Sequence, residues 1–381
     1  MIGIGSLRIG LTRINWLVAQ IAALYASAQP GAWYDQSDFA TMYQDSAGTT
    51  PGTTVGQPVG LRLDKRLGLV RGPEVCTDPG LNTPASWNVT GGTAPLWVVS
   101  GGLAVVSATS AGNRWLNNIG GALVVGKTYE ITADVVVTAG ACGPDMDGFT
   151  QDVTTSGAKR WVLKAATTTI GFIARATFIG SMDNISVKLL DGNHLTQATA
   201  ASRPLVQIDG NGKYYDAFDG VDDSMSSATG GGATTGFFWC GAVKPTGGAG
   251  TQRYLVSDHG TNSGYILFLN GTDSAQFGAG NATSYMTVSS AGAASVGSTA
   301  LVTAWDDGTN LNVQLGSGAV VSVARPVVVA GTAGFTIGKD NVSAGAFFPG
   351  NIYASVYRTG TPVTAAERAN IQAYVMQKAG L

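Results

Sequence analysis

The sequence is poor in charged side chains, and glutamate, histidine and cysteine are scarce. Charged residues make up 12% of the 381 residues, and the formal net charge is −2. Soluble proteins usually carry about 25% charged residues, and nucleic-acid-binding domains usually present a clustered basic face. The composition therefore gives no electrostatic support for a nucleic-acid partner.

The shortage of ionisable groups also argues against an enzyme. Glycoside hydrolysis usually needs two carboxylates about 5–10 Å apart, and Glu74, Glu130 and Glu367 are too dispersed to form a Glu-x-Asp-x-x-Glu string. His194 and His259 have no neighbouring Gly-x-Ser-x-Gly motif, and phosphate-loop and dinucleotide motifs are missing from the sequence. We therefore expect no catalytic residues.

The three cysteines, Cys76, Cys142 and Cys240, are odd in number and far apart. That spacing suggests neither a disulfide framework nor a zinc site. Buried free thiols are the expected state, and a Cys76–Cys142 disulfide is the alternative.

What the sequence does contain favours an all-β protein. Hydrophobic residues make up 44% of the chain and there are 54 glycines, which suits short strands separated by many turns. The stretch Tyr214–Met225 is the most informative: apolar and polar residues alternate up to Phe218, and Asp219-Gly220 then predicts a tight turn. Its Phe-Asp-Gly-Val-Asp-Asp string resembles an early strand of laminin-G-like, concanavalin-A-type sandwich domains.

Residues 1–28 contain an apolar segment that permits two interpretations. Arg8 and Arg13 precede an apolar run, and Ala26-Ser27-Ala28 imitates the cleavage site of a secretory signal. The apolar positions, however, recur in alternating steps of three and four residues, as in a coiled-coil seam. They are Ile4, Leu7, Leu11, Ile14, Val18, Ile21 and Tyr25.

This spacing predicts an N-terminal helix over residues 1–30 that joins copies of the chain, with a homotrimer as the expected assembly. A helix packed on its own chain, or on another protein, is the alternative. Asn15 and Gln20 interrupt the apolar run, so a membrane span of about 20 apolar residues is not expected.

Ala32–Lys65 closely resembles a segment of tailed-bacteriophage structural proteins that opens a laminin-G-like domain. In those proteins it leads directly into a run similar to Gly192–Thr199 and Arg203-Pro204. Here about 120 residues separate the two parts. We therefore expect one domain formed by residues 31–67 and 191–381, with a second domain, residues 68–190, inserted into it.

The insert has the pattern of a second β-sandwich. Its short β runs and its ending, Met182–Lys188, resemble jelly-roll carbohydrate-binding modules, a resemblance that is architectural rather than residue-specific. Aromatic rings stack on the apolar faces of sugars, so Trp97, Trp115 and Trp161 are candidate glycan contacts. Ordinary core packing is the alternative, because tryptophan is usually mostly buried.

Asp219, Asp222 and Asp223 are the remaining candidate site residues. Turn chemistry at the end of a strand explains them, since Asp can bond its own backbone. The alternative is a calcium ion held by the three carboxylates, although Ca²⁺ prefers six to eight oxygen ligands. We expect no required cofactor.

Near the C-terminus, Thr364 and Glu367 predict a capping box at the start of a short helix that Gly380 ends. The full expectation is an all-β fold of two jelly-roll sandwiches, one inserted in the other, with a short helix at each end.

The resemblances imply a bacteriophage virion protein: a tail fibre, a head fibre or a capsid decoration. Its N-terminal segment would contact other virion proteins, and its sandwiches would attach to host-surface glycans. A secreted or cell-surface lectin and a glycan depolymerase are the competing interpretations, because both sandwich types support many functions.

Overall fold

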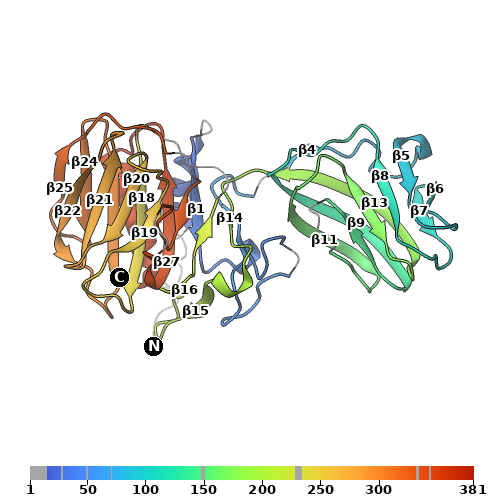
Figure 1. Ribbon diagram of the computed structural model, residues 1–381, viewed down its shortest axis with the longest axis horizontal. Coiled ribbons are helices and arrows are strands. Elements are labelled where there is room, and N and C mark those ends of the chain that lie inside the picture. Colours follow the sequence, from blue (N-terminus) through green and yellow to red (C-terminus); the bar gives the residue numbers. More distant parts are fainter. Residues whose placement is uncertain are drawn as a thin grey trace. The chain divides into compact units, whose positions relative to one another are not determined.

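The structure, a computed structural model, describes residues 15–26, 29–48, 50–69, 71–146, 151–227, 234–331, 334–342 and 345–381. The chain divides into two compact units (Figure 1). The outer unit consists of Met1–Asp45, Thr50–Gly68 and Gly192–Leu381, and the insert consists of Ser46–Thr49 and Leu69–Asp191. The main division differs by one residue at each end from the expected insertion at residues 68–190.

Within the described residues, the outer unit contains two antiparallel sheets. The eight-stranded sheet has the order β15-β16-β27-β18-β23-β24-β25, with β1 also paired to β27. Its strands are β1 (Gly31–Asp35), β15 (Leu205–Ile208), β16 (Tyr214–Asp219), β18 (Phe238–Pro245), β23 (Ala300–Asp306), β24 (Asn310–Leu315), β25 (Val321–Ala324) and β27 (Pro349–Arg358).

The second sheet, counted over the same residues, has nine strands in the order β2-β3-β14-β17-β26-β19-β20-β21-β22. They are β2 (Met42–Tyr43), β3 (Leu61–Arg62), β14 (Leu195–Thr196), β17 (Met225–Ser226), β19 (Arg253–Ser257), β20 (Tyr265–Leu269), β21 (Ser274–Gly280), β22 (Tyr285–Ala293) and β26 (Thr336–Ile337). Side chains of both sheets, including Trp239 and Phe277, share one buried core.

The stretch around Tyr214 links the two sheets of the outer unit. Phe218 of β16 points into the shared core, while Asp216 forms a buried ion pair with Arg62 of β3. Arg62 Nη2 donates to Asp216 Oδ1 over 2.6 Å and Arg62 Nε donates to Oδ2 over 3.1 Å. This bidentate geometry compensates two charges that are both removed from water.

Helices cover the other face of the eight-stranded sheet. Residues 15–23 are helical, and α2 (Ala365–Ala379) begins with the predicted capping box of Thr364 and Glu367 and ends at Gly380. Leu17 and Ile21 from the first helix and Ile371 and Tyr374 from α2 join one apolar cluster with side chains of that sheet. Three single-turn 3₁₀ helices also lie in the described residues: η2 (Phe39–Thr41), η3 (Pro84–Ser86) and η4 (Ala200–Ser202).

The insert is a smaller β-sandwich with its own core. In its described part, a six-stranded sheet has the order β11-β9-β13-β7-β6 with β4 also on β13, and a four-stranded sheet has the order β10-β12-β8-β5. The strands are β4 (Arg71–Glu74), β5 (Trp87–Thr90), β6 (Val98–Ser100), β7 (Leu103–Val106), β8 (Arg114–Asn118), β9 (Thr128–Ala139), β10 (Cys142–Pro144), β11 (Gly157–Lys164), β12 (Gly171–Ala174) and β13 (Ile179–Leu190). The expected all-β architecture of two sandwiches is thus confirmed.

The outer unit closes on itself where the insert leaves and returns. Strands β3 and β14, on either side of the insertion, pair through Leu195 and Arg62. Asp64 Oδ2 accepts a hydrogen bond from the Asn193 backbone N–H over 2.9 Å, and the Asp64 N–H donates to His194 Nδ1 over 2.9 Å. These bonds hold the two chain segments together without help from the insert.

Candidate functional site

The outward face of the six-stranded sheet in the insert is mainly polar. Side chains alternate along β9, so Ile131 and Val135 enter the core whereas Thr132 and Asp134 point outward. The register then brings residues from distant parts of the sequence together, because Arg160 of β11 lies opposite Thr132 and Ala158 lies opposite Asp134. A rigid sheet thus presents a set of hydrogen-bonding groups to solvent.

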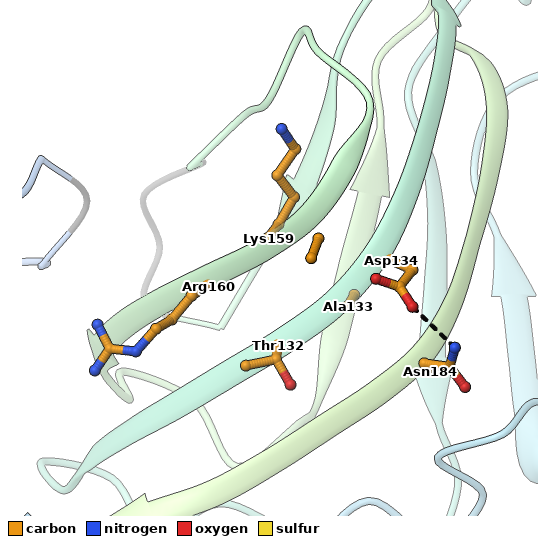
Figure 2. A pocket seen from close by; sticks show the side chains of 7 residues that line it. Thr132, Ala133, Asp134, Lys159, Arg160 and Asn184 are labelled. Carbon is orange, nitrogen blue, oxygen red and sulfur yellow. Dashed lines mark hydrogen bonds between the residues drawn. The ribbon is translucent and has the colours of Figure 1, made fainter.

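A hollow of about 370 Å³ lies on this face (Figure 2). Asp134 and Asn184 form one side of it, where Asn184 Nδ2 donates to Asp134 Oδ2 over 2.9 Å. Arg160 lies on the other side, and the Lys159 ammonium is bound to Thr155 Oγ1 and to the Ser156 carbonyl. The lining residues are Thr132, Ala133, Asp134, Ala158, Lys159, Arg160 and Asn184.

The Arg160 side of the hollow contains a cluster of three charges. Arg71 and Arg160 both contact the carboxylate of Glu130, which is 6% exposed. Burial alone would raise the pKa of Glu130, but the hydrogen bond from Arg71 and the charge of Arg160 lower it below its ordinary value. Glu130 is therefore ionised and is paired with both arginines.

Asn184 reaches the hollow because β13 is irregular at that point. The pairing of β13 with β9 shifts register between Asp183 and Ser186, and Asn184 has a φ of 50°. A bulge re-aims a side chain, and a positive φ is unfavourable for residues other than glycine, although asparagine tolerates it best. Asparagine therefore suits the bulge, where its side chain is directed to the outward face of the sheet.

Two of the three predicted tryptophans are core residues. Trp97 and Trp161 are 3% and 4% exposed, and both belong to the apolar core of the insert. Their indole N–H groups donate to the carbonyls of Arg114 and Gln151. The prediction that they contact a glycan is therefore corrected, because both side chains are buried in the core of the insert.

Trp115 differs because it points outward from the four-stranded sheet of the insert. It is half-buried, between the buried residues Arg114 and Leu116, and its indole N–H donates to Asp145 Oδ2 over 2.7 Å. Gly91, at a φ of 80°, passes so close to the ring that a Cβ would lie 2.3 Å from it. Trp115 stays a candidate contact surface on the opposite sheet from the hollow.

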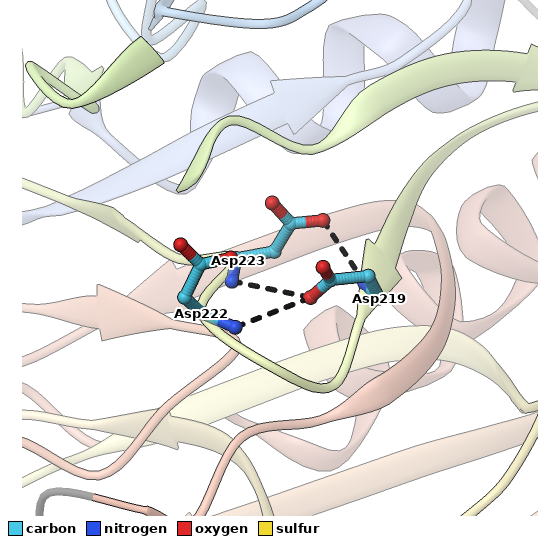
Figure 3. Close-up of side chains that lie close together, drawn as sticks. All are labelled: Asp219, Asp222 and Asp223. Carbon is cyan, nitrogen blue, oxygen red and sulfur yellow. Dashed lines mark hydrogen bonds between the residues drawn. The ribbon is translucent and has the colours of Figure 1, made fainter. Parts of the chain in front are cut away.

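The three aspartates at the end of β16 and in the turn after it, Asp219, Asp222 and Asp223, do lie together (Figure 3). Asp219 Oδ1 accepts hydrogen bonds from the N–H groups of Val221, Asp222 and Asp223, as expected for turn chemistry. Asp223 Oδ2 accepts the Asp219 N–H and Asp222 Oδ2 accepts the Ser202 hydroxyl.

These bonds leave one oxygen on each carboxylate as a potential cation ligand, fewer than the six to eight that Ca²⁺ prefers. Burial, helped by the charges of Asp219 and Asp222, raises the pKa of Asp223 to about 6. The hydrogen bonds account for the cluster as a turn, and calcium at this position stays a prediction.

The structure describes only the C-terminal half of the predicted oligomerisation seam, Val18, Ile21 and Tyr25. Ile21 is 0% and Tyr25 2% exposed, and the Tyr25 hydroxyl contacts the carbonyls of Ala32 and Tyr357. These two residues pack on their own chain, as does the partly buried Val18, which corrects the expectation that they face other copies. Leu7, Leu11 and Ile14 lie outside the described residues, so the seam stays a prediction for them. No helix in the described residues is long and apolar enough to cross a bilayer.

The histidines and cysteines occupy structural positions. His259 Nε2 contacts Asp340, and its Nδ1 lies 2.9 Å from the Tyr285 hydroxyl. Burial lowers the pKa of His259, and the charge of Asp340 opposes that shift. Cys76, Cys142 and Cys240 are all buried and free, as expected from their number and spacing.

Comparisons with known proteins give remote likenesses in fold. No protein-family model and no curated protein sequence matches the chain. A Trypanosoma rangeli sialidase is 10% identical over 49% of this chain and 31% of the sialidase, with a TM-score of 0.35. Domains LG4-5 of the mouse laminin alpha1 chain are 10% identical over 62% of this chain and 84% of that chain, with a TM-score of 0.32.

A heptameric SAP-like pentraxin from Limulus polyphemus is 12% identical over 45% of this chain and 79% of that chain, with a TM-score of 0.29. The matches span between 29% and 31% of the length of three of the sialidase chains and 62% of a fourth. These are likenesses in fold alone.

Sequence reasoning missed the residues that line the hollow. Asp134, Arg160 and Asn184 belong to three different strands, and no local motif connects them. The one local signal is Asp183-Asn184 inside an otherwise regular strand pattern, because these residue types are uncommon in strands and mark irregularities.

Proposed function

We propose that the protein is a glycan-binding adhesion protein without catalytic activity, and that the hollow in the insert holds the glycan. The observation that carries this proposal is the Asp134–Asn184 pair beside Arg160 on a rigid, solvent-facing sheet. A carboxylate and an amide side by side offer hydrogen-bond acceptors and donors to sugar hydroxyls, which act as both. The lining groups can make these bonds directly, so binding needs no cofactor.

The setting of this activity is a bacteriophage virion, where the protein is a tail fibre, head fibre or decoration. The support is the resemblance of Ala32–Lys65 and Gly192–Thr199 to segments of tailed-phage structural proteins. The segment around Leu7, Leu11 and Ile14 joins three copies or docks on another virion protein. Three linked sites raise avidity without any new contact, which suits a shallow site of modest affinity.

A glycan array tests the proposal with the intact, labelled protein. The wild-type chain and an Asp152→Ala control, altered at a partly exposed carboxylate of the insert outside the hollow, are expected to bind the same subset of glycans. Asp134→Ala is expected to lose about tenfold or more of that binding. Unchanged glycan binding by Asp134→Ala, or no glycan binding by the wild type, would refute the proposal.

Glycan cleavage is the competing activity, since Asp134 and Asp183 are cross-strand neighbours and paired carboxylates hydrolyse glycosidic bonds. A reducing-end assay on the glycans that bind separates the two functions. We expect no release above a blank. Release that Asp134→Asn and Asp183→Asn each abolish would establish a depolymerase instead.

A further inference from the structure

The hollow on the six-stranded sheet lacks the group that usually contacts the apolar face of a sugar. None of its seven lining residues is aromatic, so a sugar ring cannot stack on them. Hydrogen bonds can orient a ligand in the hollow, but each replaces a bond to water and adds little net affinity. An apolar contact beside the hollow would add affinity, and the same face of the sheet contains one.

Three valines form a row on this face, next to the hollow. Val136 follows Asp134 by two residues on β9, so the two side chains point to the same face, about 7 Å apart along the strand. Ser181 of β13 lies opposite Val136, and Val105 of β7 lies opposite Ser181. Val98 of β6, opposite Val105, ends the row.

The valines of this row are accessible to a ligand. Val136 is 54% and Val98 is 59% exposed, and Val105 is partly buried. Their neighbours Val135 and Ala104 enter the core of the insert, so regular strand alternation places the row outside. Single exposed apolar residues are ordinary on a protein surface, whereas a contiguous group of them is typical of a binding surface.

The Asp134–Asn184 pair suits neighbouring hydroxyl groups. The hydrogen bond between them uses one carboxylate oxygen and one amide proton (Figure 2), so each side chain keeps further hydrogen-bonding capacity. An acceptor and a donor side by side match two adjacent hydroxyls of a sugar ring. The site therefore offers hydrogen bonds at Asp134 and Asn184 and an apolar contact at Val136.

The spacing of these groups fits a single sugar unit. The step of about 7 Å from Asp134 to Val136 is comparable to the width of a sugar ring with its substituents. A sugar that bonds Asp134 through its hydroxyls can therefore place a substituent over Val136. There, a methyl group gains free energy by leaving water, whereas a hydroxyl group loses part of its hydration.

From this arrangement, and resting on the proposed glycan-binding function, we infer that the site selects a sugar that carries a methyl group. Two adjacent ring hydroxyls bond Asp134 and Asn184, and the methyl group packs on Val136. Two kinds of sugar have such a group: a 6-deoxyhexose and an N-acetylated amino sugar. They share the chemistry that the site recognises, and binding measurements separate them.

Biolayer interferometry of the intact protein on polyvalent sugar conjugates tests this inference. Each methyl-bearing sugar is paired with one that differs only at that group: L-fucose with L-galactose, L-rhamnose with L-mannose, and N-acetylglucosamine with N-formylglucosamine. At least one methyl-bearing sugar is expected to bind about fourfold or more tightly than its partner, as for one methyl group removed from water. The pair that shows the difference identifies a deoxy sugar or an acetamido sugar.

One substitution and a matched control locate the contact. Val136→Thr keeps the shape and the strand preference of the side chain but replaces a methyl group by a hydroxyl. It should bring the affinities of the two paired sugars within about twofold of each other. Val124→Thr makes the same change at a valine that is 60% exposed in the loop before β9, and it should leave the wild-type ratio unchanged.

Each outcome has a defined meaning. Equal binding of both sugars of every pair by the wild type would overturn the inference, as would an unchanged preference in Val136→Thr. The wild-type comparison needs no variant, so the test stays decisive if Val136→Thr folds poorly. If the glycans that bind lack a methyl group and Asp134→Ala abolishes their binding, the proposed function stands and the methyl-sugar inference fails. If no glycan binds, both fail.

Discussion

At the scale of single residues, the buried carboxylates differ in how they are compensated. Asp216 is paired with Arg62 through two hydrogen bonds, whereas Asp258 is fully buried without a cationic partner among the described residues. Asp258 Oδ1 accepts the Tyr265 N–H over 2.6 Å, and Oδ2 has no partner in the described part of the chain. Burial raises the pKa of Asp258 to about 7.

Asp258 therefore makes the stability of the outer unit depend on pH. Because its pKa is raised from 3.8 to about 7, its contribution is complete below pH 3.8 and is lost as the pH rises towards 7 and beyond. Urea unfolding at pH 4.5 and pH 8 should give a loss on the order of 2–4 kcal/mol attributable to this group. Asp258→Asn should remove that share of the pH dependence.

Asp223 contributes with the same sign over a narrower range, because burial raises its pKa to about 6. Asp223→Asn is therefore the comparison for Asp258→Asn. It should reduce the pH dependence of the free energy of unfolding only below about pH 6. If Asp258→Asn and the wild type have the same pH dependence, Asp258 is ionised in the fold.

The Asp216–Arg62 pair gives the second residue-scale prediction. Asp216→Ala would leave the Arg62 guanidinium, which is 0% exposed, buried without its counter-charge. We expect the free energy of unfolding to fall by about 3–5 kcal/mol, as measured by urea denaturation at pH 7. The double change Asp216→Leu with Arg62→Leu should recover much of the loss, and no recovery would mean that packing rather than charge causes it.

At the scale of elements, alternation and capping were the reliable signals in the sequence. The alternation at Tyr214–Phe218 predicted β16, and Thr364 with Glu367 predicted the start of α2. Both signals are local. The capping box joins residues only three positions apart, and the alternation lies within a single strand. Strand β11 (Gly157–Lys164) shows no alternation, because Lys159 and Arg160 are followed by the continuous apolar run Trp161–Leu163.

The candidate site could not be predicted because it depends on register. Trp115 and Trp161 are chemically alike in the sequence, yet strand parity turns Trp161 of β11 into the core and Trp115 of β8 outward. The hollow needs β9, β11 and β13 to be adjacent, with a bulge at Asn184. Neither adjacency nor a bulge follows from the residues of one strand.

The N-terminal helix provides the element-scale prediction. Ile21 is fully buried against the outer unit, so Ile21→Asp should destabilise the chain by about 3 kcal/mol or more. Differential scanning calorimetry would detect this as a lower melting temperature of the outer unit. Unchanged melting combined with a lower molecular mass in light scattering would show that Ile21 faces other copies, contrary to the structure.

At the scale of the whole molecule, the chain is a sandwich interrupted by a second sandwich. The hydrogen bonds of Asp64 with Asn193 and His194 hold together the two segments of the outer unit that flank the insert. The two units have separate apolar cores. An insertion is tolerated where the flanking backbone is already fixed.

Removal of the insert should therefore leave a folded outer unit. Replacing residues 69–191 by about five glycine and serine residues should preserve the melting temperature of the outer unit within a few degrees. Calorimetry of the shortened chain beside the full chain measures this. Loss of the cooperative transition would mean that the outer unit needs the insert to fold.

Glycan binding in the hollow of the insert is the central claim, and chemical-shift mapping tests it most directly. The ¹H–¹⁵N spectrum of the intact protein is recorded while the best glycan from the array is added. The account predicts shifts at Thr132, Asp134, Ala158 and Asn184, with no change at the Trp115 indole N–H. Shifts centred on Trp115, or on residues of the outer unit, would contradict it.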